Sequence, residues 1–307
     1  MKRILITGAS GFIGEALAVE GVSRGHSVFA IGAEPDGNAC VIDGAAETVA
    51  LRLPSTEIAP LLAAWRPDVL FHCAGSAFPA QSVNDPSRDF QSSVPVLHNL
   101  LEAVRTHAPN AHLIYLSSAA VYGKPYILPT PESLEPAPLS PYGFHKWLGE
   151  ILCREYSDVY GIKTSVARIF SAFGPGLERQ IIWDAIGKFR REKSPVFFGT
   201  GMESRDFIYI DDLVRALFRM AELESSSHSV INVASGEGNR ISEVIAMVAE
   251  RMGVKDGSWS FSGIESPGIP PAMIADITKL CMIGSRPECS FLEGIERTVD
   301  WALRKGA

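Results

Sequence analysis

The stretch "ILITGASGFIGEAL", residues 4–17, decides the predicted fold. A short apolar run typical of a buried strand comes first, and a helical pattern follows it. Gly8, Gly11 and Gly14 lie between the two in a G-x-x-G-x-x-G arrangement. Glycines at such positions allow a tight turn and a close approach to a pyrophosphate, which binds at the N-terminus of the helix. The stretch therefore predicts a dinucleotide-binding turn, with a glycine-rich turn that only packs a helix on a sheet as the alternative.

The alternation of strand and helix continues through the first half of the chain. Further buried strands are expected at "HSVFAIG", "DVLFHCAG", "AHLIYLSS" and "IKTSVARIF", and helices over residues 12–24, 58–65, 89–107 and 142–160. This order predicts an α/β fold with a doubly wound parallel sheet of the Rossmann type. The segment after "VFAIG" has turn signals and little helical pattern, so we expect a shortened loop there in place of a crossover helix.

The character of the chain changes after residue 170, where glycine, proline and aromatic residues become frequent. "HSVINVAS" is apolar enough to be a late strand that returns to the first domain. We expect a Rossmann domain over residues 1–170, with a return near 208–235. A smaller mixed α/β domain that binds the substrate is expected over 171–207 and 236–307. The proline-rich segment "PYILPTPESLEPAPLSP" predicts a loop that faces the substrate.

Composition narrows the class of protein. The 307 residues are 46% hydrophobic and 21% charged, and the formal net charge is −7, which favours neither nucleic acid nor an anionic membrane as a partner. The five cysteines are widely spaced and form no C-x-x-C pair, so a reducing compartment is expected and a zinc or other metal site is not. No apolar run is long enough to cross a membrane, and we expect a cytoplasmic location.

The stretch "SPYGFHKWLGE", residues 140–150, places Tyr142 four residues before Lys146. On a helix these side chains share one face, and an ammonium beside a phenol favours the phenolate, as a proton shuttle needs. An ordinary polar pair at a helix start is the alternative. "YLSSAAVYG" places Ser117 and Ser118 at the carboxyl end of a strand, where such sheets bind ligands. A hydroxyl, a phenol and an ammonium are therefore expected near the cofactor.

Taken together, these motifs resemble the extended short-chain dehydrogenase/reductase family, in its nucleotide-sugar epimerase/dehydratase branch. The resemblance covers nearly the whole chain. It rests on the stretches "TGASGFIG", "LSSAAVYG", "PYGFHK", "RIFSAFGPG", "FFGTGMESRDFIYIDDL", "ADITKL" and "LEGIERTVDWAL".

The resemblance implies roles for individual residues. Tyr142 is expected to be the acid/base at a sugar hydroxyl or ketone, and Lys146 to bind the nicotinamide ribose and favour the phenolate. Ser118 is expected to hydrogen-bond the same sugar oxygen, with Ser117 as the less favoured of the two serines. The cofactor-binding residues implied are Gly8, Ser10, Gly11, Phe12, Ile13, Gly14, Ala74 and Lys146. Arg205 is expected to pair with the substrate diphosphate, with a salt bridge to Asp206 or Glu203 as the alternative.

Two departures from the family pattern bear on the reaction and the cofactor. Ala119 and Ala120 stand where dehydratases carry an Asp-Glu pair, which argues against 4,6-dehydration. Gly32 stands where NAD-selective members place an acidic residue for the ribose 2′-OH, and Glu34 or Asp36 are substitutes from the following loop. NAD is the expected cofactor, and NADP remains possible.

Other departures concern the grip on the substrate. Ser171 and Ser266 replace an asparagine and an arginine that are frequent in the family. Arg179 is a candidate second cation, and a solvated helix residue is its alternative. Trp183 and Phe198 are candidates for stacking on a nucleobase, although a buried core position is the favoured interpretation of each.

The resulting functional prediction is an NAD(P)-dependent epimerase of a nucleotide-activated sugar, at C4 through a transient 4-keto intermediate. A 4-ketoreductase that consumes NAD(P)H is the alternative, and a non-catalytic dinucleotide-binding regulator is the alternative from another class. A homodimer is implied by the resemblance, through the helices at 89–107 and 142–160. These helices carry apolar residues at helical spacing: Leu97, Leu100, Leu101, Val104, Leu148, Ile151 and Leu152.

Overall fold

The structure is a computed structural model that describes residues 1–33, 37–223, 228–264 and 270–306. The chain divides into two compact units. The first contains residues 1–123, 135–169 and 214–231, and the second contains residues 124–134, 170–213 and 232–307.

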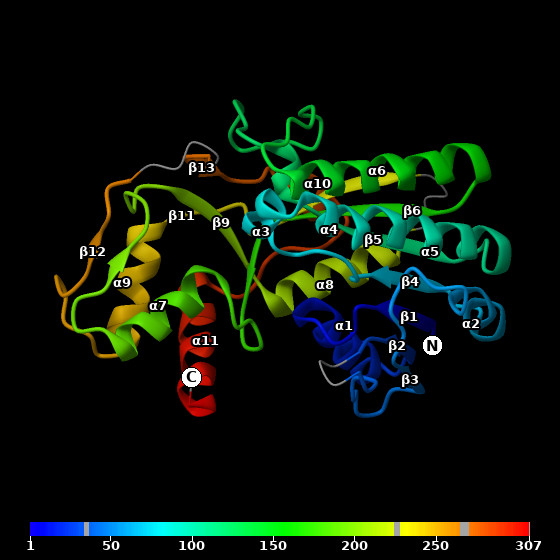
Figure 1. The fold of residues 1–307 in the computed structure, drawn as a ribbon, viewed down its shortest axis with the longest axis horizontal. Coiled ribbons are helices and arrows are strands. Elements are labelled where there is room, and N and C mark those ends of the chain that lie inside the picture. Colours follow the sequence, from blue (N-terminus) through cyan, green and yellow to red (C-terminus); the bar gives the residue numbers. More distant parts are fainter. Residues whose placement is uncertain (34–36, 224–227, 265–269, 307) are drawn as a thin grey trace. The chain divides into compact units, whose positions relative to one another are not determined.

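A seven-stranded sheet forms the centre of the first unit (Figure 1). Its strands run in the order β10-β6-β5-β4-β1-β2-β3, and the pairs from β6 to β3 are parallel. The prediction of a doubly wound Rossmann sheet is thereby confirmed. Because β1 lies between β2 and β4, the direction of winding reverses there, which creates the crevice where such sheets bind ligands. The strands are β1 (Arg3–Thr7), β2 (Ser27–Ile31), β3 (Glu47–Val49), β4 (Val69–His72), β5 (His112–Ser118), β6 (Thr164–Ile169) and β10 (Ser229–Val233).

Helices cover both faces of this sheet because its strands are apolar on both sides. One face packs against α2 (Ile58–Trp65), α5 (Val94–His107) and α6 (Pro141–Tyr160), around a core that includes Leu5, Leu70 and Leu113. The other face packs against α1 (Phe12–Ser23) and α8 (Ile210–Ala221), where the rings of Phe71 and Phe218 lie 5.4 Å apart. Figure 1 shows α5 and α6 running along the same side of the sheet.

The local predictions failed in two places. The single helix expected over 89–107 is two helices, α4 (Pro86–Gln91) and α5, which follow the short α3 (Pro79–Asn84). Pro86 and Pro95 each stand in a first helical turn, where proline is favoured, so each begins a new helix. The strand β3 was also not foreseen, because only its three residues pair with β2. Between β2 and β3 the described residues contain no helix, in agreement with the predicted loop.

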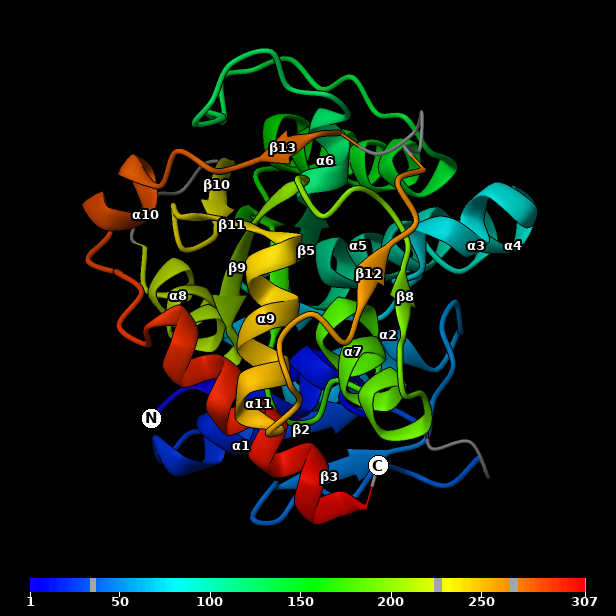
Figure 2. The same ribbon diagram turned by 90° about the vertical axis from the view of Figure 1, so that its left-hand side faces the viewer.

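The second unit is smaller and mixed. Strand β9 (Ser204–Tyr209) is central: it pairs in parallel with β7 (Ser171–Phe173) and β13 (Ala272–Met273) and antiparallel with β11 (Gly238–Arg240). Strands β8 (Val196–Phe197) and β12 (Ser260–Phe261) form a separate parallel pair. The helices are α7 (Gln180–Arg191), α9 (Ile241–Arg251), α10 (Thr278–Met282) and α11 (Phe291–Lys305). Figure 2 shows α7, α9 and α11 gathered beside this sheet.

Among the described residues, none of the helices combines the length and the apolar character that a bilayer crossing requires.

Candidate active site

The glycine turn after β1 is held against the loop that follows β4. Gly8 has a φ of +71°, and a Cβ added to it would lie 2.6 Å from the backbone nitrogen of Ala74. A Cβ on Gly14 would overlap the carbonyl oxygen of Gly8. Larger residues would therefore force the turn open at the point where β1 and β4 diverge. Both positions thus behave as a dinucleotide-binding turn requires.

A buried hydrogen bond joins the ends of these two strands beneath the glycine turn. The hydroxyl of Thr7 lies 2.7 Å from Nδ1 of His72, and the Ala74 amide donates to the same hydroxyl at 3.4 Å. Burial, helped by the Lys146 ammonium, lowers the pKa of His72 to about 3, so the imidazole is neutral. Sequence reasoning missed this pair, because a threonine and a histidine at strand ends carry no distinctive pattern.

The start of α1 offers free amides to an anion. Gly11 is the N-cap, and no side chain of the described residues caps the helix, which leaves the first-turn N–H groups at Phe12, Ile13 and Gly14 for a ligand. Ser10 is exposed, and its hydroxyl donates to the carbonyl of Ala33 at 3.1 Å. This turn is suited to the pyrophosphate of a dinucleotide. Its residues are small, its helix start has amides to offer, and it lies at the crevice of the sheet.

Gly32 follows β2 and lies close to the same turn. A Cβ at this position would lie 2.7 Å from the Ser10 amide nitrogen, so a side chain here would press on the glycine turn. The suggested acidic substitutes, Glu34 and Asp36, lie outside the described residues, as does Ser266.

Ser117 and Ser118 end β5 and point in different directions. Ser118 is half-buried, and its Oγ accepts a hydrogen bond from the Ala120 amide at 3.2 Å, which leaves its O–H free to donate. Ser117 is buried and donates to Glu150 at 2.5 Å. The Ser117 hydroxyl is thus committed to an internal partner, and we no longer assign it a part in substrate binding.

Helix α6 carries Tyr142 and Lys146 in its first two turns. Ser140 caps the helix by accepting from the Gly143 amide, and Pro141 begins its first turn. A Cβ on Gly143 would lie 2.7 Å from the carbonyl oxygen of Ala120, so α6 lies directly against the turn that follows Ser118. The packing therefore brings the helix of Tyr142 to the end of β5.

Lys146 is almost fully buried between α6 and the sheet. Its ammonium donates to the Leu116 carbonyl at 2.9 Å and lies 5.7 Å from the centre of the Tyr142 ring. Burial lowers the pKa of Lys146 to about 8, and the carboxylates of Asp89 and Glu150 act in the opposite direction. Tyr142 and Lys146 lie on one face of α6, as predicted. Both side chains are buried, so they are not the ordinary polar pair at a helix start that was the alternative.

A buried ion pair supports this region from the middle of α6. Glu150 receives the Arg168 guanidinium through two nitrogens, the closer at 2.7 Å, together with the Ser117 hydroxyl. The guanidinium also lies 4.8 Å from the centre of the Tyr122 ring. The cluster links α6, β5 and β6 behind Ser118. The sequence signal for it was Glu150 standing one turn beyond Lys146.

Arg205 lies in the second unit, on β9. Its guanidinium donates to the Ser204 carbonyl at 2.7 Å, and within the described residues it forms no salt bridge. Asp206 accepts instead from Ser235, Gly236 and Ala275. Glu203 accepts from the Thr200 amide. The salt-bridge alternative for Arg205 was therefore wrong, and its half-buried charge is available to an anion.

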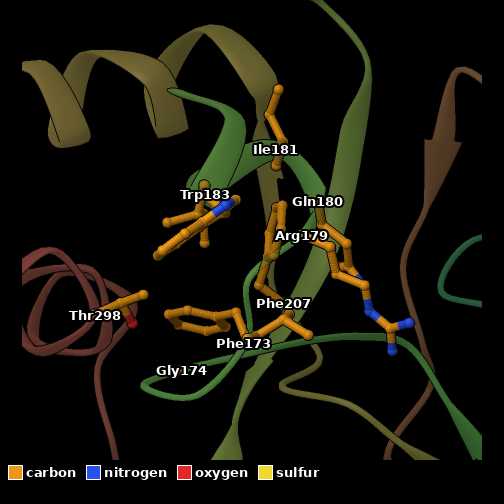
Figure 3. A pocket seen from close by; sticks show the side chains of 10 residues that line it. Phe173, Gly174, Arg179, Gln180, Ile181, Trp183, Phe207 and Thr298 are labelled. Carbon is orange, nitrogen blue, oxygen red and sulfur yellow. The ribbon is translucent and has the colours of Figure 1, made fainter. Parts of the chain in front are cut away.

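Arg179 and Gln180 stand at the start of α7. Together with Trp183 and Arg191 they line a cavity of about 310 Å³. Figure 3 shows a smaller adjoining cavity, where the Arg179 guanidinium points away from the rings of Trp183 and Phe173. Gln180 has a φ of +67°, which is rare for a residue with a side chain and is often found at binding sites.

The two aromatic candidates differ in exposure. Phe198 is 58% exposed, whereas its neighbour Phe197 fills the core. The favoured prediction of a buried role for Phe198 was therefore wrong. Trp183 is half-buried, and its ring lies 5.5 Å from that of Trp301.

The helices α5 and α6 differ in what they expose. The α5 leucines Leu97, Leu100 and Leu101 are buried against the sheet and are thus excluded from any surface contact. On α6, by contrast, Leu148 is 39% and Ile151 46% exposed, and Phe144 and Val159 extend this stripe along the helix.

Comparison with known proteins agrees with this geometry. Residues 4–234 match the NAD-dependent epimerase/dehydratase family. The chain belongs to this family. The UDP-glucose 4-epimerase of Mycolicibacterium smegmatis is 27% identical over 320 residues, covering 99% of each protein. The GDP-6-deoxy-D-mannose reductase of Pseudomonas aeruginosa is 29% identical, covering 81% of this chain and 80% of the reductase.

Solved structures of family members superpose over almost the whole chain. The UDP-glucose 4-epimerase of Thermotoga maritima, in a complex with UDP-glucose, gives a TM-score of 0.89 at 26% identity and covers 99% of this chain and all of that one. The UDP-glucuronic acid 4-epimerase of Bacillus cereus, with UDP-glucuronic acid and NAD, gives 0.88 at 28% identity and covers 99% of each. The prediction of an NAD-dependent enzyme of the epimerase/reductase type is thereby confirmed at the level of the family.

Proposed function

We propose that this protein is an NAD-dependent 4-epimerase that acts on a nucleotide-activated sugar. The observation that carries the proposal is the meeting of three features in the first unit. These are a glycine turn suited to pyrophosphate, a free serine hydroxyl at the end of β5, and a tyrosine beside a buried ammonium on the adjoining helix. The relatives at 26–28% identity that are 4-epimerases support the same activity.

The residues that would hold the dinucleotide are those of the glycine turn and its neighbours. Gly8 and Ala74 give it room, the amides at the start of α1 bind its pyrophosphate, and Lys146 binds the nicotinamide ribose. The full set is Gly8, Ser10, Gly11, Phe12, Ile13, Gly14, Ala74 and Lys146. When bound, the nicotinamide supplies the hydride acceptor and donor of the reaction.

Tyr142 and Ser118 act on the sugar C4 oxygen. The phenolate of Tyr142 accepts the hydroxyl proton as a ketone forms at C4 and returns it once the sugar has presented its other face. The ammonium of Lys146 stabilises the phenolate because the two share one face of α6. The O–H of Ser118 donates to the C4 oxygen, because its own acceptor side is occupied by the Ala120 amide.

We further propose that the second unit binds the nucleotide diphosphate. Arg205 is half-buried and forms no salt bridge in the described part of the chain, so its planar fork suits phosphate oxygens. Arg179 is the second cation that we assign to this role. Phe198 offers an exposed ring on which a nucleobase can stack.

A 4-ketoreductase is the second candidate function. Two observations favour it: Gly32 supplies no acidic side chain for the ribose 2′-OH of NAD, and one relative is a GDP-6-deoxy-D-mannose reductase. Such an enzyme uses Tyr142 and Ser118 in the same positions. It differs in needing a fresh reduced cofactor at every turnover, whereas an epimerase regenerates its own.

The first experiment identifies the cofactor that accompanies the purified protein. The protein is denatured, and any released dinucleotide is identified by mass spectrometry. Stoichiometric NAD followed by interconversion of a UDP-sugar pair without added cofactor, observed by proton NMR, is the expected result. Tyr142→Phe should retain the cofactor and lose turnover. Turnover that survives Tyr142→Phe would refute the assigned mechanism, and a requirement for NADPH with a 4-keto sugar would favour the reductase.

A further inference from the structure

Asp89 is a buried carboxylate that the proposed reaction does not use. It stands in the short helix α4, and only 4% of its surface is exposed. Its Oδ2 lies 2.5 Å from Nδ1 of His145, whereas its Oδ1 is buried and has no hydrogen-bond partner among the described residues. A half-satisfied buried carboxylate is costly, so its presence calls for an explanation.

The helices α3 and α4 hold the beginning of α6 at two points, and Asp89 is one of them (Figure 1). At the other, Oγ of Ser82 accepts from the backbone amide of Tyr142 at 3.1 Å and donates to the Pro79 carbonyl. His145, the partner of Asp89, directly precedes Lys146, and its ring meets that of Phe90 in an edge-to-face arrangement. The contact of Asp89 therefore falls on the turn of α6 that carries both proposed active residues.

The charged and titratable groups around Lys146 come from four elements. Tyr115 faces it from β5, His72 and Cys73 from the end of β4, Tyr142 and Glu150 from α6, and Asp89 from α4. His72 is neutral, and burial keeps the Cys73 thiol protonated by raising its pKa to about 12. Glu150 is committed to the Arg168 guanidinium at 2.7 Å. Of the two described carboxylates that raise the pKa of Lys146, Asp89 is the one that is not paired with a guanidinium.

We propose that Asp89 is a positioning residue: its hydrogen bond to His145 fixes the first turns of α6 and places a buried carboxylate beside the turn that carries Lys146. The inference rests on the proposed roles of Tyr142 and Lys146. Because an ionised carboxylate only accepts hydrogen bonds, Nδ1 of His145 carries the proton between them. The contact therefore holds the carboxylate in place without requiring a charged imidazole.

The test measures the titration of the Lys146 side chain itself. Lysine labelled with ¹³C at Cε is incorporated, the signals are followed by NMR from pH 6 to 11, and Lys146→Arg identifies the signal of interest. Asp89→Asn removes the charge and keeps an oxygen that can accept from His145. The midpoint of Lys146 should fall by about 0.5–1 pH unit, because a negative charge that stabilised the ammonium is lost. An unchanged midpoint in a folded Asp89→Asn protein would overturn the proposal.

Asp212→Asn is the matched control. Asp212 is equally buried and accepts from the backbone amides of Glu288 and Cys289, but it lies in the second unit. This variant is expected to lose stability and to leave the Lys146 midpoint unchanged. An equal shift in both variants would show that loss of stability alone moves the midpoint, and would refute a specific effect of Asp89.

Two further measurements test the role of Asp89 separately from its effect on folding and from the proposed function. If Asp89→Asn does not fold, the ¹³Cγ signal of Asp89 in the unaltered protein decides, since a protonated Asp89 at pH 7 is incompatible with the proposal. In turnover assays, Asp89→Asn should move the alkaline limb of the kcat profile to lower pH by the same amount as the NMR midpoint. A shifted NMR midpoint in a protein that turns over no nucleotide sugar would sustain the role of Asp89 and refute the proposed function instead.

Discussion

Replacement of Lys146 by methionine should stabilise the protein that has been stripped of dinucleotide. Burial lowers the pKa of Lys146 from 10.5 to about 8, which means that the folded state carries its ammonium at a cost. A shift of that size corresponds to about 3 kcal/mol at pH 7. Methionine removes this cost but leaves the Leu116 carbonyl without its donor, a loss of about 1 kcal/mol. The net gain in unfolding free energy is about 2 kcal/mol.

The dependence on pH identifies the cause of this gain. Between pH 8 and pH 10.5 the unfolded chain holds a proton on Lys146 that the folded chain has released, so the stability of the unaltered protein rises with pH relative to Lys146→Met. The advantage of the variant should therefore be full at pH 7 and shrink above pH 8. Subtracting the unfolding free energies of the two proteins removes the effects of the other groups that titrate in this range.

Urea unfolding at pH 7, 8, 9 and 10, followed by circular dichroism, measures the difference. Lys163→Met is the control, because Lys163 is half-buried and also donates to a backbone carbonyl, that of Leu223. The pH dependence of the Lys146→Met difference is compared with that of this control. A constant difference for Lys146→Met would refute the reasoning, as would a loss of stability at pH 7. Saturating NAD should then reverse the order of stability of the two proteins, because only the unaltered chain has the lysine that we propose binds the nicotinamide ribose.

Three other substitutions test separate parts of the structure. Gly14→Ala should abolish dinucleotide binding and lower the melting temperature, because its Cβ overlaps the Gly8 carbonyl, and isothermal calorimetry and thermal unfolding measure these effects. Gly21→Ala on the same helix should be far milder, since its Cβ would meet side chains rather than backbone, the nearest being a Val28 methyl at 3.0 Å. Arg205→Ala should raise the KM for the nucleotide sugar roughly 10- to 100-fold and leave the NAD affinity unchanged. Arg205→Lys should recover only part of the loss, because lysine lacks the planar fork. An altered NAD affinity would contradict a role in diphosphate binding. If the chain forms the homodimer that the family resemblance implies, Ile151→Glu should convert it to a monomer in light scattering, since the residue is 46% exposed on α6. A dimer that persists would place the interface elsewhere.

The elements that the sequence predicted well are those whose pattern is determined locally. The strand, glycine turn and helix at residues 4–17 follow one another within a few residues, so the spacing of Gly8 and Gly14 carries the whole geometry. The face shared by Tyr142 and Lys146 likewise needs only the helical repeat. The resemblance to a family then supplied the meaning of these motifs, which periodicity alone does not contain.

The predictions failed where the surroundings of a side chain depend on partners that are distant in the sequence. Two adjacent serines look equivalent in "LSSAAVYG", yet Ser117 is bound by Glu150, 33 residues away, while Ser118 remains open. Phe197 and Phe198 form another such pair, because the start of a two-residue strand decides which ring enters the core. Consecutive side chains of a strand point to opposite faces of the sheet, so adjacent residues of the same type have different surroundings. Which residue faces which side depends on how the strand pairs with its neighbours, and that pairing is set by tertiary contacts.

The buried groups around Lys146 suggest why the first turn of α6 is supported so heavily. An ammonium brought out of water favours its neutral form, and the proposed chemistry at Tyr142 needs the charged one. Support for the ammonium comes from outside α6: the Leu116 carbonyl accepts its hydrogen bond, and the Asp89 carboxylate, which contacts His145, is proposed to act beside it. Local sequence describes the pair Tyr142 and Lys146 but not the field in which it operates, since that field comes from residues 30 and 57 positions earlier in the chain. Activity in this protein is therefore expected to be sensitive to substitutions in α4 that touch neither substrate nor cofactor.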